Sequence, residues 1–155
     1  MNKKVKNATP LLYDNIQFKS TMEVTAYKAL KEEGFNPQYE QYTYEIWKGR
    51  KFNVPCYDLH KNRKMHKDMW ELNKYKAQSI KYTPDFTFDV NDTFIVVEIK
   101  GFANDRYPYV KKLFRSWLEE NKPQSIFFEV HNKKQLNAAI DIIKNINNQN
   151  QKQDV

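Results

Sequence analysis

The sequence predicts an α/β fold in which a mixed central sheet is flanked by helices. Segments with helical periodicity alternate with segments of strand-like pattern, which favours this class over an all-α or all-β fold. A chain of 155 residues with 40% hydrophobic residues suits a single domain with a buried core, which we expect over about residues 18–146. A basic stretch separates the first predicted strand from the second, and we expect it to be an insertion (about 48–79). The expected order of elements is αβββαβα.

The first half of the core is predicted as a helix followed by an aromatic-rich strand. Apolar residues recur at helical spacing from Ser20 to Glu33, and Gly34 is a typical helix stop. Residues 39–47 alternate and are rich in aromatic side chains, which is typical of a strand. In the basic insertion, the apolar residues Met65, Met69 and Leu72 predict a short helix.

The second half is predicted as a hairpin, a helix, a strand and a final helix. Strands over 80–90 and 93–100 meet at the turn-forming pair Asn91-Asp92. Residues 106–121 form a strongly amphipathic helix, 125–131 an apolar strand and 133–146 the last helix. The expected core positions of the three helices are Met22, Ala26, Ala29, Leu30, Val110, Leu113, Phe114, Trp117, Leu118, Leu136, Ala139, Ile140 and Ile143. The polar residues 147–155 are expected to be a frayed tail, and about the first ten residues to be similarly loose.

The charge of the chain points to a polyanionic partner. The formal net charge is +7, and residues 48–78 alone hold nine Lys or Arg against three acids, a net +6. Such a field favours nucleic acid, because each neutralised phosphate releases counterions. The alternative is a solvated basic loop without a partner.

The sequence does not support a membrane protein, a secreted protein or a disulfide-stabilised protein. No apolar run approaches the roughly 20 residues that cross a bilayer, and no apolar segment follows the basic N-terminus as in a signal peptide. The lone Cys56 cannot form an internal disulfide. We therefore expect a cytoplasmic protein that uses no membrane and no small-molecule cofactor.

The predicted hairpin brings two carboxylates together. If Val90 and Thr93 flank the turn, paired residue numbers sum to 183 and Asp85 lies opposite Glu98. Both side chains then project from one sheet face with Cβ atoms about 5 Å apart, and Lys100 points the same way. The opposite face is filled by Phe86, Phe88, Val97 and Ile99.

Such a pair predicts a metal site. At an effective dielectric near 20, two carboxylates about 5 Å apart repel by roughly 3 kcal/mol. A divalent cation turns this penalty into binding, and Mg²⁺, for which Mn²⁺ can substitute, prefers carboxylate oxygens and water. We expect Asp85 and Glu98 to hold one or two Mg²⁺ ions, with the backbone carbonyl of Ile99 as a further ligand. Lys100 would orient or activate a water for phosphodiester hydrolysis.

Two alternatives stay open at this point. In a different register, Asp85 would cap the strand while Glu98 and Lys100 face solvent. Glu23 fits a capping box with Ser20, in which it satisfies the helix N-terminus, and it equally could point into the metal site.

Pro84-Asp85, followed after twelve residues by Glu98-Ile99-Lys100, resembles the PD-(D/E)xK nuclease motif. The order of further residues is similar to that in the phage endonuclease I family of Holliday-junction resolvases. These residues are Phe18-x-Ser20-x-x-Glu23, Gly34, Tyr39-Glu40, Tyr82-Thr83-Pro84-Asp85-Phe86 and Val97-Glu98-x-Lys100-Gly101. The similarity runs from about Phe18 to Val130, interrupted by the insertion.

The resemblance implies a restriction-endonuclease-like αβββαβ core, Mg²⁺-dependent cleavage of branched DNA, and a homodimer. It implies metal-binding acids at Glu23, Asp85 and Glu98 and a catalytic lysine at Lys100. The 48–79 insertion is longer than the link between these strands in the resolvases, which puts the dimer architecture in question. The basic residues expected to contact DNA phosphates, rather than form a solvated face, are Arg50, Lys51, Arg63, Lys64, Lys67, Arg106, Lys111, Lys112 and Arg115.

Other functions remain possible on the same residues. The chain could instead be a nuclease that cuts linear duplex DNA, like a restriction enzyme. It could also be like the endonuclease domain of a transposase subunit, which it resembles at Glu40-Gln41 and Lys48-Gly49-Arg50. A catalytically silent DNA-binding module with the same fold is the non-enzymatic alternative. Within the insertion, Cys56, His60 and His66 are a weak zinc pattern without a fourth ligand. Aromatic residues there (Tyr57, Trp70 and Tyr75) either stack on exposed bases or pack a small satellite core.

Overall fold

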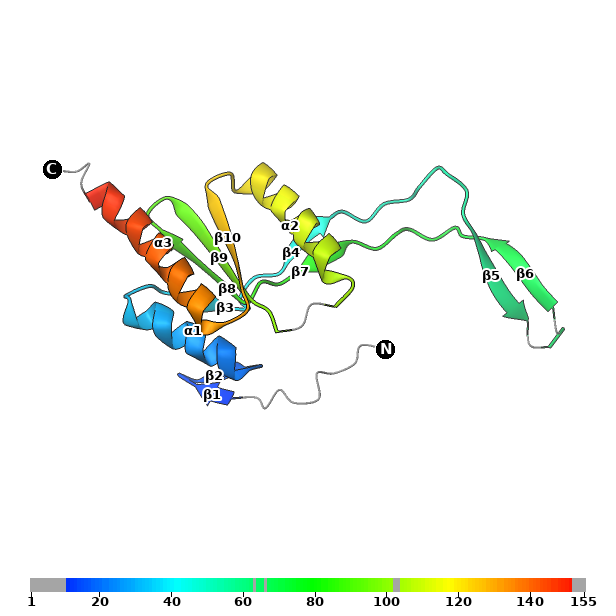
Figure 1. Ribbon diagram of the computed structural model, residues 1–155. Coiled ribbons are helices and arrows are strands. Elements are labelled where there is room, and N and C mark those ends of the chain that lie inside the picture. The colour runs from blue at the N-terminus through cyan, green and yellow to red at the C-terminus, as the bar shows by residue number, and fades with distance from the viewer. Residues whose placement is uncertain (1–10, 63, 66, 102–103, 152–155) are drawn as a thin grey trace. The chain divides into compact units, whose positions relative to one another are not determined.

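The computed structural model of the chain describes residues 11–62, 64–65, 67–101 and 104–151 (Figure 1). These residues group into two compact units. The first contains the residues up to 44 and those from 82 onward, and the second contains residues 45–81. The second unit coincides closely with the basic insertion predicted from the sequence.

A four-stranded mixed sheet forms the centre of the first unit (Figure 1). Its strand order is β10 (Ser125–Val130), β9 (Thr93–Ile99), β8 (Phe86–Val90) and β3 (Gln38–Tyr39). The β3–β8 and β8–β9 pairs are antiparallel, whereas β9 and β10 are parallel. Parallel neighbours need a crossover, which helix α2 (Tyr107–Asn121) supplies. The predicted mixed α/β architecture is therefore confirmed.

Helices cover the two faces of this sheet. Helices α1 (Thr21–Glu32) and α3 (Lys133–Gln151) pack on one face, against a cluster that includes Phe86, Val97 and Ile99. All four core positions predicted for α3 are buried. On the other face, the buried α2 residue Phe114 meets Phe127 of β10 edge to face, with ring centroids 5.9 Å apart.

The predicted register of the β8–β9 hairpin is confirmed. Phe86 pairs with Val97 and Val90 pairs with Thr93, so the residue numbers of partners sum to 183. Asn91 adopts a positive φ of 52°, a conformation that Asn tolerates better than most residues. The turn therefore fixes which side chains share each face of the hairpin.

Two segments predicted as single strands are each broken in two. The 39–47 strand is wrong because Glu40 has a φ of 42°, which ends β3 before β4 (Tyr44–Trp47) begins. The 80–90 strand is wrong because Pro84, which has no N–H to donate to a ladder, separates β7 (Ile80–Tyr82) from β8. Strands β4 and β7 pair with each other in a two-stranded sheet of their own.

The second unit contains an antiparallel hairpin instead of the short helix predicted around Met65, Met69 and Leu72. Strands β5 (Tyr57–Asn62) and β6 (Lys67–Leu72) pair along their full length, so cross-strand pairing prevails over the apolar spacing. At the base of this unit Gly49 lies directly against the backbone of residues 77–79, where a Cβ would overlap backbone atoms. Only glycine permits this close approach.

The described chain begins with a hairpin that the sequence did not predict and ends with a longer helix than predicted, while residues 1–10, expected to be loose, lie outside the described residues. A hairpin of β1 (Leu11–Tyr13) and β2 (Ile16–Phe18) precedes α1, with Asp14 and Asn15 at positive φ in its turn. The Asp14 carboxylate accepts a 2.7 Å hydrogen bond from the Tyr27 hydroxyl of α1. Helix α3 continues to Gln151, so the tail predicted from 147 is wrong up to that residue; no Gly or Pro stops the helix. Among the described helices, none is long and apolar enough to cross a membrane.

Replacing Gly34 with alanine tests the end of α1. Gly34 has a φ of +84° and an added Cβ would meet no atom within 4 Å, so only backbone strain opposes the substitution. We expect Gly34→Ala to lower the free energy of unfolding by about 1 kcal/mol in urea titrations. Gly101→Ala is the matched control, because its Cβ also meets open space and its φ is not in the left-handed region. Equal stability of the two variants would contradict the role given to Gly34.

Candidate functional site

The carboxylates of Asp85 and Glu98 meet where β8 begins and β9 ends. Asp85 Oδ2 accepts a 2.7 Å hydrogen bond from the backbone N–H of Ile99, and Glu98 Oε2 accepts one of 3.2 Å from that of Asp85. Each side chain is thus held by the backbone of the opposite strand. The predicted approach of these two acids on one face of the hairpin is confirmed.

Lys100 completes the group. Its Nζ donates a 2.6 Å hydrogen bond to Glu98 Oε1 and lies 4.1 Å from the centre of the Tyr107 ring. Glu98 is only 3% exposed, and Lys100 is partly buried. The alternative in which Glu98 and Lys100 simply face solvent is therefore wrong.

The pair leaves Asp85 with an unusual proton affinity. Burial and the negative charge of Glu98 raise the pKa of Asp85 to about 8, and Glu23 adds to this rise. The hydrogen bond from Ile99 and the charge of Lys100 act in the opposite direction without cancelling it. The single positive charge of Lys100 therefore does not balance the two carboxylates, and this imbalance favours binding of a cation.

Tyr82 lies beside the same acids. Burial, followed by the charge of Glu98, strongly raises the pKa of its hydroxyl. This oxygen is buried and makes no hydrogen bond of ordinary geometry to any described residue. A buried polar atom of this kind next to two carboxylates is suited to a water or metal-bound water.

A third acid lies in the same row on the neighbouring strand. Glu129 of β10 pairs in register with Glu98 of β9, so the two side chains share a face. Glu129 is ion-paired with Lys111 at 2.5 Å and His131 at 2.8 Å, and accepts a 3.0 Å hydrogen bond from the Tyr107 hydroxyl. Burial raises the pKa of Glu129, but the hydrogen bonds with Lys111, His131 and Tyr107 outweigh burial and bring this pKa below its usual value.

Sequence reasoning did not identify Tyr82, Tyr107 or Glu129 as neighbours of the site. For Glu129 a signal exists, since it is a lone acid inside an otherwise apolar strand. For the two tyrosines, the proximity depends on how α2 and β7 approach the sheet, which local pattern does not encode.

Glu23 acts as a helix cap. Its backbone N–H donates to Ser20 Oγ at 3.2 Å, and its carboxylate accepts hydrogen bonds from the Ser20 hydroxyl and the Lys19 N–H. The Tyr39 hydroxyl donates a further bond of 2.6 Å. The capping role of Ser20 is thus confirmed, whereas the Glu23 carboxylate accepts from the N–H of Lys19, one residue before the N-cap, and not from that of Ser20 as in a regular capping box. Because the charge of Glu23 also raises the pKa of Asp85, the cap lies within electrostatic reach of the acidic pair. Its role as a metal ligand stays a prediction.

Residues 3–135 match a family model described as "Protein of unknown function (DUF1064)". The chain belongs to the DUF1064 family. The matched region of this DUF1064 member contains Glu23, Asp85, Glu98 and Lys100. No curated protein and no solved structure is significantly similar to the chain.

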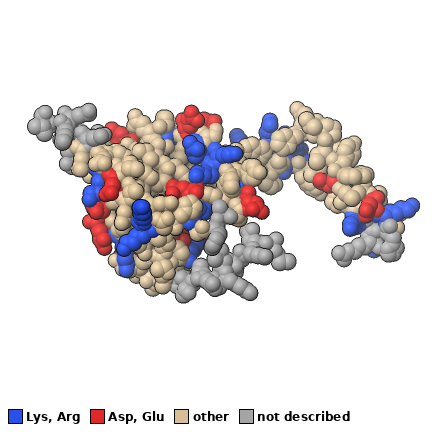
Figure 2. Space-filling view, viewed as in Figure 1, with Lys and Arg blue, Asp and Glu red and all other residues tan. Residues whose placement is uncertain are grey.

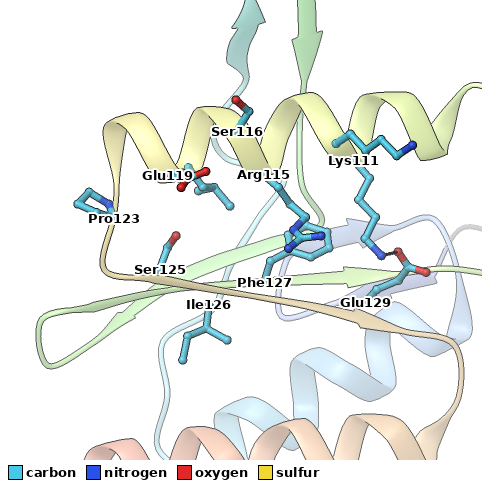
Figure 3. Close-up of a pocket in the computed structure, with 11 residues that line it drawn as sticks. Lys111, Arg115, Ser116, Glu119, Pro123, Ser125, Ile126, Phe127 and Glu129 are labelled. Atoms are coloured by element: carbon cyan, nitrogen blue, oxygen red, sulfur yellow. Dashed lines mark ion pairs between the residues drawn. The ribbon is translucent and has the colours of Figure 1, made fainter.

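The predicted DNA contacts of the DUF1064 chain lie on both units, and basic side chains are visible on each in Figure 2. Those of the insertion that can be placed are Arg50, Lys51, Lys64 and Lys67, whereas Arg63 lies outside the described residues. Arg106 occupies the N-cap of α2. Along α2, Lys111, Lys112 and Arg115 line a groove of about 800 Å³ between the helix and β10 (Figure 3).

This groove is not purely cationic. Glu119 and Glu129 lie among its basic residues, and Lys111 is paired with Glu129 (Figure 3). Lys112 and Arg115, which also line the groove, are exposed, and Arg115 extends from α2 toward Phe127 (Figure 3). The α2 contacts to phosphate therefore stay a prediction that rests mainly on these two side chains and Arg106.

The zinc pattern gains no support. Cys56 and His60 are exposed, and His66 lies outside the described residues. Within the described part of the chain, no three His, Cys, Asp or Glu side chains are close enough to hold a metal ion together. Any metal at Asp85 and Glu98 would therefore need backbone oxygen, water or substrate for its remaining ligands.

The stability of the metal-free protein should depend on Asp85 in a defined direction. A folded pKa of about 8, above that of an unfolded Asp, means that folding favours the protonated carboxyl. This contribution is fully present below about pH 4 and is lost as pH rises through about 8. In EDTA, we expect Asp85→Asn to raise the melting temperature at about pH 8.5, to raise it less at about pH 5, and to change it little at about pH 4.

The matched control for this measurement is Asp89→Asn, which changes an exposed acid of β8, the strand that begins directly after Asp85. It should leave the pH dependence of the wild type intact. Parallel melting curves of wild type and Asp85→Asn across this pH range would contradict the raised pKa.

Ser20 and Glu23 allow the capping and site roles to be separated. We expect Ser20→Ala to cost about 1 kcal/mol of unfolding free energy, because it removes the N-cap acceptor, and to leave Mg²⁺ affinity unchanged. Glu23→Gln should weaken Mg²⁺ binding in calorimetry, because it removes a negative charge that acts on Asp85. Glu23→Gln with unchanged Mg²⁺ affinity but reduced stability would leave Glu23 as a cap alone.

Proposed function

We propose that this protein is a metal-dependent endonuclease that hydrolyses DNA phosphodiester bonds. The observation that carries the proposal is the convergence of the buried Glu98 carboxylate and the half-buried Asp85 carboxylate with the ammonium group of Lys100. Such an acidic pair with one lysine is costly unless it serves a bound cation, and this trio matches the PD-(D/E)xK pattern.

The donor set suits Mg²⁺, with Mn²⁺ as a substitute. Carboxylate oxygens are hard ligands, and the buried Tyr82 hydroxyl offers a hydrogen-bonding group for a coordinated water. When bound, the metal lowers the pKa of a water ligand and neutralises charge on the phosphate. Asp85 and Glu98 would hold it, with the Ile99 carbonyl as a further ligand, while Glu23 would act on the site through its negative charge.

The residues of the chain hold the reacting groups in place. The backbone bonds across β8 and β9 fix both carboxylates, so little reorganisation is needed on binding. Lys100 is held between Glu98 and the face of Tyr107, from which its ammonium orients the attacking water and stabilises charge on the phosphate. Glu129 keeps the Tyr107 hydroxyl in position.

The order of elements supports a restriction-endonuclease-like core. Helix α1, strands β3, β8 and β9, helix α2 and strand β10 follow the αβββαβ order, with residues 45–81 inserted after β3. The resemblance to the resolvases favours branched DNA as the substrate and a homodimer as the working form, and the lone Cys56 suits a cytoplasmic location.

A cleavage assay tests the proposal. Purified protein is incubated with a four-way junction and with a linear duplex of equal length, in Mg²⁺ and in EDTA. We expect Mg²⁺-dependent cleavage of the junction, reduced by roughly a hundredfold or more in Asp85→Asn, which removes a metal ligand. Asp89→Asn, which changes an exposed acid of β8, is the matched control and should cut as well as wild type.

The outcomes separate the candidate functions. Cuts confined to the junction support a resolvase. Cleavage of the linear duplex, lost in Asp85→Asn, keeps the site and moves the substrate toward a restriction- or transposition-type nuclease. DNA binding without cleavage in Mg²⁺ or Mn²⁺ would overturn the proposal and leave a DNA-binding module.

A further inference from the structure

The hairpin of β5 and β6 has one apolar face. In its register Tyr57 pairs with Leu72 and Leu59 pairs with Trp70, so these four side chains share a face. The opposite face carries polar pairs such as Asp58 with Glu71. The hairpin is therefore amphipathic, like a sheet that packs against another layer of the protein on one face.

The apolar face is exposed. Trp70 is 68% exposed and Tyr57 is 57% exposed, and both leucines are also accessible. Every side chain of β6 is exposed, so the hairpin has no core of its own in the described part of the chain. A two-stranded hairpin gains little stability alone, and a contiguous exposed apolar surface typically marks a binding site.

The charge of the surrounding segment indicates the kind of partner. Residues 48–78 carry a net +6, and within the hairpin Lys61 lies on the apolar face next to its cross-strand partner Asp68. A second copy of the chain would bring the same positive segment against this one, which repulsion opposes. A polyanion is attracted by the same charge.

We propose that the apolar face of the β5–β6 hairpin stacks on unpaired bases of nucleic acid, with Trp70 and Tyr57 as the stacking side chains. The register makes these two residues diagonal neighbours on adjacent strands, about 7–8 Å apart, which gives each ring room for one base. Aromatic stacking contributes about 1–3 kcal/mol per base and does not depend on base identity. In an intact duplex the base faces are already stacked, so the partner must contain unpaired nucleotides.

This inference deepens the proposed nuclease function, on which it rests for its biological context. It names the substrate as DNA with unpaired nucleotides near the cut, such as an open junction or a single-stranded flap. The stacking step itself does not involve Asp85, Glu98 or Lys100, so it is measurable without cleavage.

The test measures binding of the full chain in EDTA, by fluorescence anisotropy, to a labelled oligo(dT) of about 20 nucleotides and to a duplex of equal length. We expect Trp70→Ala to weaken binding of oligo(dT) by about tenfold and to change duplex binding little. Trp70→Phe should restore most of the affinity, because it restores an aromatic face. Met69→Ala is the matched control, because Met69 is exposed on the opposite face of the same strand.

Three results would overturn the inference. The first is equal oligo(dT) affinity of wild type and Trp70→Ala. The second is an equal loss for oligo(dT) and duplex, which indicates a general structural effect. The third is unchanged DNA affinity together with loss of a dimer in light scattering, which indicates that a second copy covers this face.

Failure of this inference and failure of the nuclease proposal are distinguishable. A protein that cuts no DNA but binds oligo(dT) through Trp70 would keep the stacking surface and remove the nuclease function. A protein that cuts in an Asp85-dependent manner but binds DNA independently of Trp70 would do the reverse.

Discussion

Electrostatic repulsion between Asp85 and Glu98 is the constraint around which the ends of β8 and β9 are built. A buried carboxylate beside a half-buried one needs hydrogen bonds and positive charge to offset the repulsion, and the chain supplies only part of both. Each acid accepts a single N–H from the opposite strand, and Lys100 brings one positive charge for two negative ones. The negative charge that is left unbalanced raises the pKa of Asp85. A fold under no functional demand would more easily relieve this repulsion with one neutral residue.

The neighbouring acid Glu129 shows that the shortage of positive charge is confined to the Asp85–Glu98 pair. It lies beside Glu98 on the same face, yet it has Lys111 and His131 as cationic partners and a lowered pKa. The pKa is raised at Asp85 and lowered at Glu129, because only Glu129 has two cationic partners. This contrast supports placing a cation at the Asp85–Glu98 pair, where positive charge is missing, and not beside Glu129, where it is already supplied.

Features that depend on residues close together in the sequence could be predicted, whereas features that depend on distant residues could not. The Asn91-Asp92 turn and the alternation of apolar residues are sufficient to set the β8–β9 register, and with it the meeting of Asp85 and Glu98. The breaks at Glu40 and Pro84 were missed, because β4 and β7 find each other across more than thirty residues. The surroundings of the site, Tyr82 and Tyr107 among them, come from tertiary packing. Strand β6 is mispredicted as a helix because Met65, Met69 and Leu72 have helical spacing, whereas the strand depends on pairing with β5.

The two units are stabilised in different ways, and this difference fits the proposal that one unit cleaves DNA and the other selects the substrate. The first unit has a continuous core and holds its acids by backbone hydrogen bonds, which is what chemistry requires of a catalytic group. The hairpin of the second unit leaves its apolar face exposed, so its stability depends on what binds it. A surface that gains stability from its partner discriminates between partners by how well they cover it, and unpaired bases cover an aromatic face that a closed duplex cannot reach. In the proposed enzyme, substrate selection would therefore belong to residues 45–81 and bond cleavage to the sheet.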